Sequence, residues 1–287
     1  MVRRFIPIVL ALTTLLAACG TSPDPQTLVS SASQATTESG RARMFLETKV
    51  SGLGVGGDVT TTGEGLVDFE NQSGNLAMQL PSIGQASPGD VELAYQGTVL
   101  YYRASSLFPD APTPWVSIDI ARVSEAVTGT DLGQLNQGAS NDPSNTLALL
   151  DGVADDVEEV GTEEIRGEET THYRATVDVR RALEQQGAVA DRQQFETFLD
   201  QFGSETIPVE VWLDDEGRTR RMRYDQPLPE TPGTPIPAGA AVSSTIELYD
   251  FGTDAPVEIP PPSDVTDLTE ATTEATEDLS TTTSTTI

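Results

Sequence analysis

The chain has 287 residues, and its 16 Lys and Arg against 45 Asp and Glu give a formal net charge of −29 at pH 7. Such an acidic chain lacks the basic footprint that nucleic-acid binding requires, and its folded part is not expected to lie flat on anionic lipid. A single histidine and a single cysteine exclude an ordinary His/Cys zinc site and a disulfide within the chain.

The N-terminal segment combines a short basic start, Arg3 and Arg4, with an apolar run from Phe5 to Ala18. The run is shorter than the roughly 20 helical residues that span a bilayer, but it suits the hydrophobic region of a secretory signal. It ends in "LAACG", which resembles a bacterial lipobox. The resemblance implies a signal peptide over residues 1–18, cleavage before Cys19, and a diacylglyceryl group on the Cys19 thiol.

Two other roles for Cys19 are a small buried apolar residue and a catalytic nucleophile. A catalytic thiol needs a histidine base and would not sit inside an export signal, so lipidation is the preferred interpretation. Acyl chains on Cys19 would hold the mature protein outside the cell as a membrane-anchored lipoprotein, since lipid chains of this kind give stable anchoring. A polar tether over residues 19–25 would then lead to the folded domain.

A helix is predicted first in the domain, over residues 25–39, with Leu28, Ala32 and Ala35 on one side. After it the hydrophobic period changes from helical to two, as in Met44, Leu46 and Val50, and this alternation is typical of half-buried strands. Strands are predicted in the segments 41–50, 75–80, 90–105, 171–179, 208–225 and 241–252. The third segment turns near Gln96-Gly97 and the fifth near Glu216-Gly217.

Helices are predicted among the later strands, at 142–153, 178–187 and 191–203. Asp142-Pro143 is a good start for the first, because Asp caps a helix and Pro suits its first position. The third carries an apolar stripe of Phe195, Phe198, Leu199 and Phe202. Together the elements predict an α+β domain over residues 26–252, with a long curved antiparallel sheet and a few helices against its apolar face.

Two segments are predicted to lack regular structure. Residues 227–240 are rich in Pro and Gly and form a loop inside the domain. Residues 253–287 are an acidic, Thr-rich tail with almost nothing to bury from Pro260 onward, so we expect the tail to be disordered.

Candidate catalytic and metal-binding residues are few. His172 is the only possible histidine base, and its place on the polar face of a predicted strand favours a solvated residue. The acidic pairs around 155–164 lack the spacing of a calcium loop, and the glycines at 52–57 lack the lysine of a P-loop. We therefore expect no catalytic residue, no metal site and no cofactor.

Aromatic and basic residues allow more than one interpretation. Trp115 and Trp212 would suit ligand stacking, but core or sheet-edge positions are preferred. Arg218, Arg220, Arg221 and Arg223 form a basic cluster that would attract an anionic headgroup, although pairing with nearby carboxylates is the preferred account.

Three stretches resemble one family. They are "GTEEIRGEETTHYRATVD" at 161–178, "VLYYR" to "PWVSID" at 99–119, and "IPVEVWLDDEGRTRRM" at 207–222, which in this order are similar to the LppX/LprG-type lipoproteins of actinobacteria. The resemblance implies a half-barrel fold related to the LolA/LolB carriers, without enzymatic activity, that binds an acylated lipid or glycolipid and carries it outward. The apolar cavity would be lined by Met44, Leu46, Leu76, Met78, Leu93, Leu100, Tyr102, Tyr173, Val211 and Leu213.

Two alternatives to a lipid carrier remain open at this point. The same ten residues would also form a filled core, and the domain would then be an anchored interaction module for an envelope protein or a cell-wall component. A hydrolase of envelope polymers would depend on His172 as its base.

Overall fold

The computed structural model describes residues 24–52, 57–80, 89–103, 111–128, 143–154, 156–185, 204–228, 237 and 239–275. The predicted signal peptide and Cys19, and the helix expected at 191–203, lie outside these residues. No helix among the described residues has the length and apolar character needed to cross a membrane.

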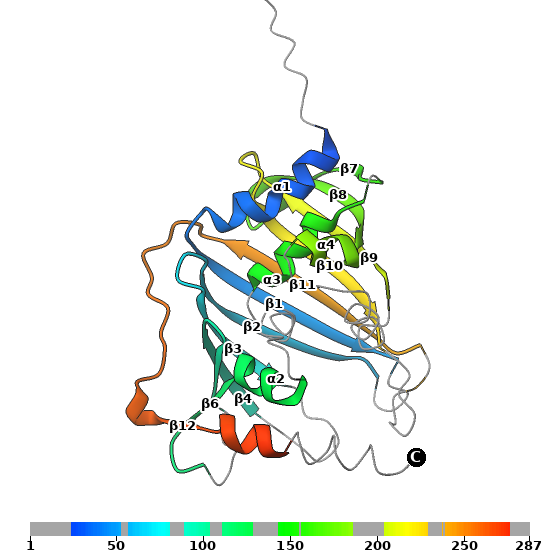
Figure 1. Cartoon of the computed structure of the whole chain (residues 1–287). Coiled ribbons are helices and arrows are strands. Elements are labelled where there is room, and N and C mark those ends of the chain that lie inside the picture. Colours follow the sequence, from blue (N-terminus) through cyan, green and yellow to red (C-terminus); the bar gives the residue numbers. More distant parts are fainter. Residues whose placement is uncertain are drawn as a thin grey trace, which may run out of the picture.

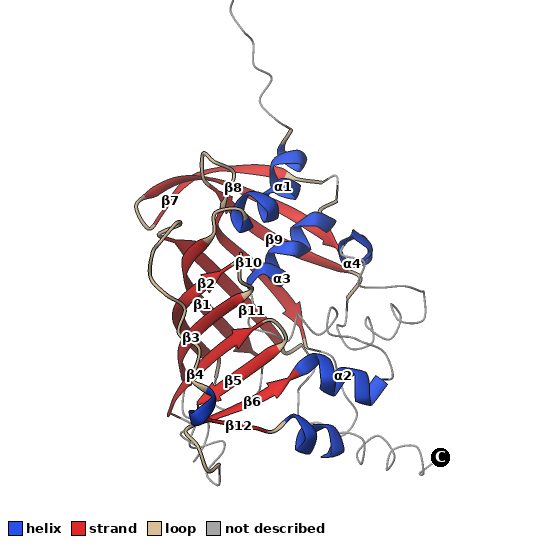
Figure 2. Cartoon of the chain, turned by 60° about the vertical axis from the view of Figure 1, so that its left-hand side comes forward, coloured by secondary structure: helices blue, strands red, loops and turns tan. Residues whose placement is uncertain are grey.

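A twelve-stranded, strongly curved sheet dominates the described structure (Figures 1 and 2), with the strand order β12-β6-β5-β4-β3-β2-β1-β11-β10-β9-β8-β7. Its neighbouring strands pair in antiparallel fashion except at one edge, where β12 runs parallel to β6. The strands are β1 Arg41–Ser51, β2 Val59–Asp68, β3 Ser73–Leu80, β4 Gly89–Gln96, β5 Val99–Arg103, β6 Trp115–Asp119, β7 Glu158–Ile165, β8 Glu168–Asp178, β9 Thr206–Leu213, β10 Thr219–Pro227, β11 Ala241–Tyr249 and β12 Val265–Asp267. The expected α+β class with a curved antiparallel sheet is therefore confirmed.

Helices lie against the concave side of the sheet, which we call the inner face (Figure 2). They are α1 Pro25–Thr37, α2 Ile120–Thr128, α3 Pro143–Leu147 with the 3-10 turn η2 Ala148–Gly152, and α4 Val179–Gln185. The three helices predicted at 25–39, 142–153 and 178–187 are thus confirmed. α1 buries Val29, Ala32, Ser33 and Thr36. Ala32 is thus buried as predicted, but Val29 and Thr36, the residues that follow Leu28 and Ala35, are buried in place of those two.

The inner face of the sheet forms the core with these helices. Alternate residues of each strand point inward, and the buried ones include Met44 and Val67 next to the helices and Val211 and Leu248 on the following strands. Burying side chains of this size contributes about 1.5–3 kcal/mol each. Residues between them, such as Arg43 and Arg223, point to the opposite side, which we call the outer face, and are exposed.

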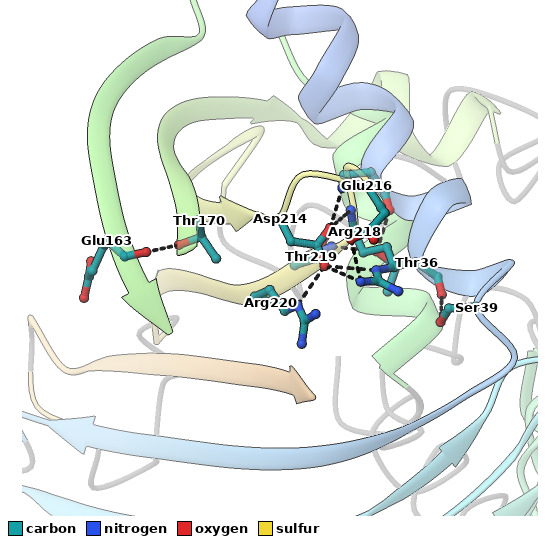
Figure 3. Close-up of polar contacts among 10 residues, drawn as sticks. Thr36, Ser39, Glu163, Thr170, Asp214, Glu216, Arg218, Thr219 and Arg220 are labelled. Atoms are coloured by element: carbon teal, nitrogen blue, oxygen red, sulfur yellow. Dashed lines mark hydrogen bonds and ion pairs between the residues drawn. The ribbon is translucent and has the colours of Figure 1, made fainter. Parts of the chain in front are cut away.

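α1 is fixed to the β9–β10 turn by polar contacts (Figure 3). The backbone N–H of Thr219 donates to Thr36 Oγ1 over 2.8 Å, and that hydroxyl in turn donates to the Ala32 carbonyl over 2.6 Å. Asp214 holds the turn itself, because its carboxylate accepts from the backbone of Arg218 and from the guanidinium groups of Arg218 and Arg220. The predicted hairpin at 208–225 is confirmed, and the turn is closed by one buried carboxylate.

The C-terminal segment differs from the expected disordered tail in residues 253–275. After β11 the chain passes outside the strands to the far edge of the sheet, where β12 pairs with β6 (Figure 1). Val265 to Asp267 lie opposite Trp115 to Ser117, and Thr269 is buried. The expected disorder was wrong for this part. A short strand can be stabilised by backbone hydrogen bonds to the unpaired edge of a sheet, and amino-acid composition does not reveal such pairing. Residues 276–287 lie outside the described part.

Candidate functional site

The ten residues predicted to line a cavity all lie on the inner face, but they fall into two groups. Seven are at most 6% exposed, namely Met44, Leu76, Leu93, Leu100, Tyr173, Val211 and Leu213. Leu46, Met78 and Tyr102 are only partly buried. The seven fully buried residues therefore belong to the packed interior, and contact of any of the ten with lipid stays a prediction.

A small gap between β3, β4 and β5 shows how tightly this end is packed. It has a volume of about 10 Å³ and is lined in part by Leu76, Leu93, Leu100 and Tyr102. A space of this size holds about one water molecule and cannot take an acyl chain.

Partly buried apolar residues continue across the inner face beyond the helices. We call them the apolar floor, which consists of Leu46, Met78, Leu80, Tyr102 and Tyr224. Leu46 on β1 lies opposite Gly63 on β2, and Gly63 lies opposite Met78 on β3. The floor therefore runs over adjacent strands rather than as isolated residues.

Gly63 shapes the middle of the floor. A Cβ atom at this position would lie 2.7 Å from Met78 Cγ and 3.0 Å from Leu76 Cδ1. Only glycine lets these two side chains lean over β2, so they fill the space above Gly63. The Met78 side chain therefore extends over β2 toward Leu46, and the floor is continuous across the three strands. No pattern in the sequence marked Gly63, because its role depends on which strands are neighbours.

The outer face carries a row of aromatic and charged residues in cross-strand register. Phe45 lies opposite Glu247, Glu247 opposite Arg221, Arg221 opposite Trp212, and Trp212 opposite His172. The His172 and Trp212 rings stack with centroids 4.1 Å apart, and Trp212 Nε1 donates to Glu163 over 2.7 Å. The side chains of this outer-face row thus lie next to one another across adjacent strands.

Glu247 is the most heavily bonded residue of this row. Its carboxylate accepts from Arg166 over 2.6 Å and from Arg221 over 2.6 and 2.9 Å. Burial raises the pKa of Glu247, but the hydrogen bonds from Arg221 and Arg166 outweigh burial, and the pKa lies below its usual value.

The basic cluster of the β9–β10 hairpin is paired with carboxylates, as preferred from the sequence. Arg218 and Arg220 contact Asp214, Arg221 contacts Glu247 and Glu163, and Arg223 contacts Asp225 at 3.8 Å. An anionic ligand would have to compete with these bonds.

His172 is placed away from an obvious catalytic arrangement. Its Nε2 lies 2.8 Å from a carboxylate oxygen of Glu210 but makes no hydrogen bond to the described residues, and its ring is stacked on Trp212. Within the described ranges, no group of three or more His, Cys, Asp or Glu residues is arranged to hold a metal ion.

A second hollow lies on the outer face, under the C-terminal segment. It has a volume of about 190 Å³, and its lining includes Glu64, Ala77, Glu92, Trp115 and, from the C-terminal segment, Glu258. Ala77 lies opposite both Glu64 and Glu92 in the sheet, which puts one carboxylate on each side of a small side chain. Trp115 therefore lies on the strand next to the β12 edge and forms one wall of a groove.

Comparison with known proteins gives likenesses of sequence and fold. No family model matches the chain. An uncharacterized 31.2 kDa protein of the rplA-rplJ intergenic region of Streptomyces griseus is 34% identical over 118 residues, which is 40% of this chain and 35% of that protein. The match thus spans about a third of the length of that relative.

Solved structures with a similar arrangement include lipoproteins and a LolA superfamily protein. The chain is similar to lipoprotein LppX of Mycobacterium tuberculosis, with 16% identity and a TM-score of 0.47, over 83% of this chain and all of that one. For LprF of Mycobacterium bovis the values are 16% and 0.42, over 84% and 98% of the two chains. For LolA superfamily protein NE2245 of Nitrosomonas europaea they are 10% and 0.31, over 84% and 97%. LppX and the LolA superfamily are among the groups that the sequence resemblance names.

Proposed function

We propose that this protein is a cell-envelope lipoprotein that binds an acylated lipid on its inner face and carries or presents it at the outer side of the membrane. The observation that supports the proposal is the apolar floor, in which Leu46, Met78, Leu80, Tyr102 and Tyr224 are incompletely buried on the concave side of the sheet. A floor of this kind favours acyl chains, because each methylene removed from water contributes about 0.8 kcal/mol. Binding of this type is non-covalent and needs no catalytic residue.

The lipid would lie in the open concavity rather than inside a sealed hole. Gly63 lets the Met78 side chain lie over β2, so Leu46 and Met78 would present one continuous apolar surface to an acyl chain, and the helices α1, α3 and α4 cover another part of the inner face. An acyl chain there would contact the partly buried residues and leave the packed interior unchanged. This arrangement explains how a filled core and a lipid site can share one sheet.

The N-terminal sequence supports the location that we propose. Cys19 carries the lipobox pattern, and α1 begins at Pro25, six residues later. Six residues reach at most about 20 Å when extended, so a lipid on Cys19 would keep the domain close to the membrane surface. A short tether of this kind suits a protein that takes lipid from, or gives lipid to, that membrane.

Displacement of a fluorescent C16 fatty acid from Cys19→Ser protein, which cannot be acylated, tests the proposal. Met78→Glu places a charge in the floor and should abolish binding, because a carboxylate in contact with an acyl chain loses its hydration. Gln79→Glu is the matched control, since Gln79 is the next residue of β3 and is exposed on the outer face. Equal binding by Met78→Glu, Gln79→Glu and the parent protein would refute the floor as the site.

The alternative of an anchored interaction module is favoured by a different observation, the outer groove under the C-terminal segment. Trp115 and the carboxylates of Glu64, Glu92 and Glu258 would suit a basic segment of an envelope protein. Pull-down with a Glu64→Gln/Glu258→Gln variant as control tests this function. A partner that binds both forms equally would exclude the groove.

A further inference from the structure

Four hydroxyl groups form a row on the inner face that begins at Tyr224 of the apolar floor and continues beside that floor. In cross-strand register, Tyr224 of β10 lies opposite Ser244 of β11, Ser244 opposite Thr48 of β1, and Thr48 opposite Thr61 of β2. Each points inward, because each is two positions from an inward-facing neighbour such as Met222, Ile246 or Leu46. Neighbouring strands are about 4.8 Å apart, so the hydroxyl row extends over roughly 14 Å.

The side chains of the hydroxyl row make no hydrogen bonds to groups in the part of the chain that the structure describes. Among the described residues, none of the four makes a side-chain hydrogen bond, although Ser39, Thr36 and Thr170 elsewhere in the chain all do. Thr48, Thr61 and Tyr224 are partly exposed, and the Ser244 hydroxyl is not among the sealed polar atoms that lack a partner. Their donors and acceptors are therefore open to water or to a ligand.

The described inward positions of β1, β2, β3 and β11 around the row carry no charge. The inward positions of β11 are Val242, Ser244, Ile246 and Leu248, and those of β1 are Ala42, Met44, Leu46, Thr48 and Val50. Those of β2 and β3 are Val59, Thr61, Gly63, Gly65, Val67, Gly74, Leu76, Met78 and Leu80. A phosphate would find no cation at these positions to replace its water shell, and the net charge of −29 would repel it.

We propose that the bound lipid places an uncharged hydrogen-bonding group, a hydroxyl or ester, on the hydroxyl row while its acyl chain lies on the apolar floor. This inference rests on the proposed function and narrows its ligand to a non-phosphorylated amphiphile. The spacing agrees with this proposal. Leu46 of the floor and Thr48 of the row are two positions apart on β1, a distance of about 7 Å, so the apolar floor and the hydroxyl row adjoin. Acylglycerols and acylated sugars share this chemistry.

The test compares three palmitoyl probes on the Cys19→Ser protein: 1-monopalmitoylglycerol, 6-O-palmitoylglucose and palmitoyl lysophosphatidic acid. Diphenylhexatriene, which has no hydrogen-bonding group, reports the apolar floor alone. We expect one or both neutral lipids to bind at least tenfold more tightly than the lysophosphatidic acid, and the stronger of the two identifies glycerol or sugar as the source. Tighter binding of the lysophosphatidic acid would overturn the inference.

The variant Thr48→Val/Ser244→Ala keeps the shape of the row and removes two hydroxyls. It should lower the affinity for the preferred neutral lipid roughly tenfold, the effect of two ordinary hydrogen bonds, and leave diphenylhexatriene binding unchanged or tighter. Thr60→Val, an exposed outer-face position on β2, is the control. Unchanged affinity of the double variant would show that the row is only hydrated. Failure of every probe to bind the parent protein would instead refute the proposed function.

Discussion

The backbone N–H of Thr219 is bonded to the side-chain hydroxyl of Thr36, 183 positions earlier in the chain, and both residues are almost fully buried. This bond joins α1 to β10 and so fixes the first helix on the inner face. The Oγ1 of Thr219 itself has no partner among the described residues, although it is sealed from solvent. The two hydroxyls are therefore expected to respond to mutation in opposite ways.

Thr36→Val should destabilise the protein by about 1–3 kcal/mol, because it leaves the buried Thr219 N–H without an acceptor. Thr219→Val should be neutral or stabilising, since it replaces an unpaired buried hydroxyl with a methyl group and keeps the backbone bond. The free energy of unfolding in urea measures both. A Thr36→Val variant as stable as the parent would contradict the role given to this bond.

Asp214 should make the stability of the protein depend on pH at acid pH. Burial raises the pKa of this carboxyl, but hydrogen bonds from Arg218 and Arg220 outweigh burial and hold the pKa below its usual value. A carboxyl with a lowered folded-state pKa contributes stability above its unfolded pKa, near 4, and that stability is lost as the pH falls through the folded value.

Urea unfolding of the parent and of Asp214→Asn at pH 7 and pH 3 checks this. At pH 7 we expect the variant to lose about 3 kcal/mol, because two arginines lose a buried partner. The loss should shrink toward pH 3. A difference between the two proteins that stays constant over this range would exclude Asp214 as a source of acid sensitivity.

Glu247 should be the most sensitive charged residue of the outer face. Its side chain is 10% exposed and bonds Arg166 and Arg221, so Glu247→Ala should cost about 2–4 kcal/mol in the free energy of unfolding. Arg223→Ala is the comparison, since its contact with Asp225 is 3.8 Å long and exposed, and its loss should stay within about 0.5 kcal/mol. Equal losses in the two variants would contradict the importance of burial here.

Removal of residues 253–287 should leave the domain folded but open the edge of β6. Leu268 N–H donates to the Ser117 carbonyl, and Asp119 N–H donates to Thr269 Oγ1, so both bonds would be lost. Hydrogen exchange at β6 should accelerate, and the truncated protein should associate through its free edge strand. Thr269→Ala should accelerate exchange at Asp119 alone. Unchanged exchange after truncation would mean that β12 does not protect this edge.

The sequence predicted the strands that alternate cleanly and the helices with clear caps. Met44 and Leu46, for example, show the period of two, and Asp142-Pro143 marks a helix start. Local periodicity is set by burial of one face, so it can be read without knowledge of the neighbours. β12 was missed because its three residues are held by the exposed edge of β6, far away in the chain.

The candidate site was predicted only in part, for the same reason. Alternation placed Leu46 and Met78 on the inner face, but it could not separate them from Met44, which is fully buried. That difference depends on where the helices end over the sheet. The hydroxyl row and the close packing over Gly63 depend on register between strands, which the chain order of Thr48, Thr61 and Ser244 does not reveal.

Mass spectrometry of the organic extract from purified Cys19→Ser protein, produced in a lipid-rich host, tests the lipid-binding proposal most directly. We predict that the extract contains an acylated lipid in stoichiometric amount, and that the extract of Met78→Glu contains little or none. An extract of the parent protein without lipid, from a preparation shown to be folded by its unfolding transition, would contradict the proposal that the apolar floor holds a lipid.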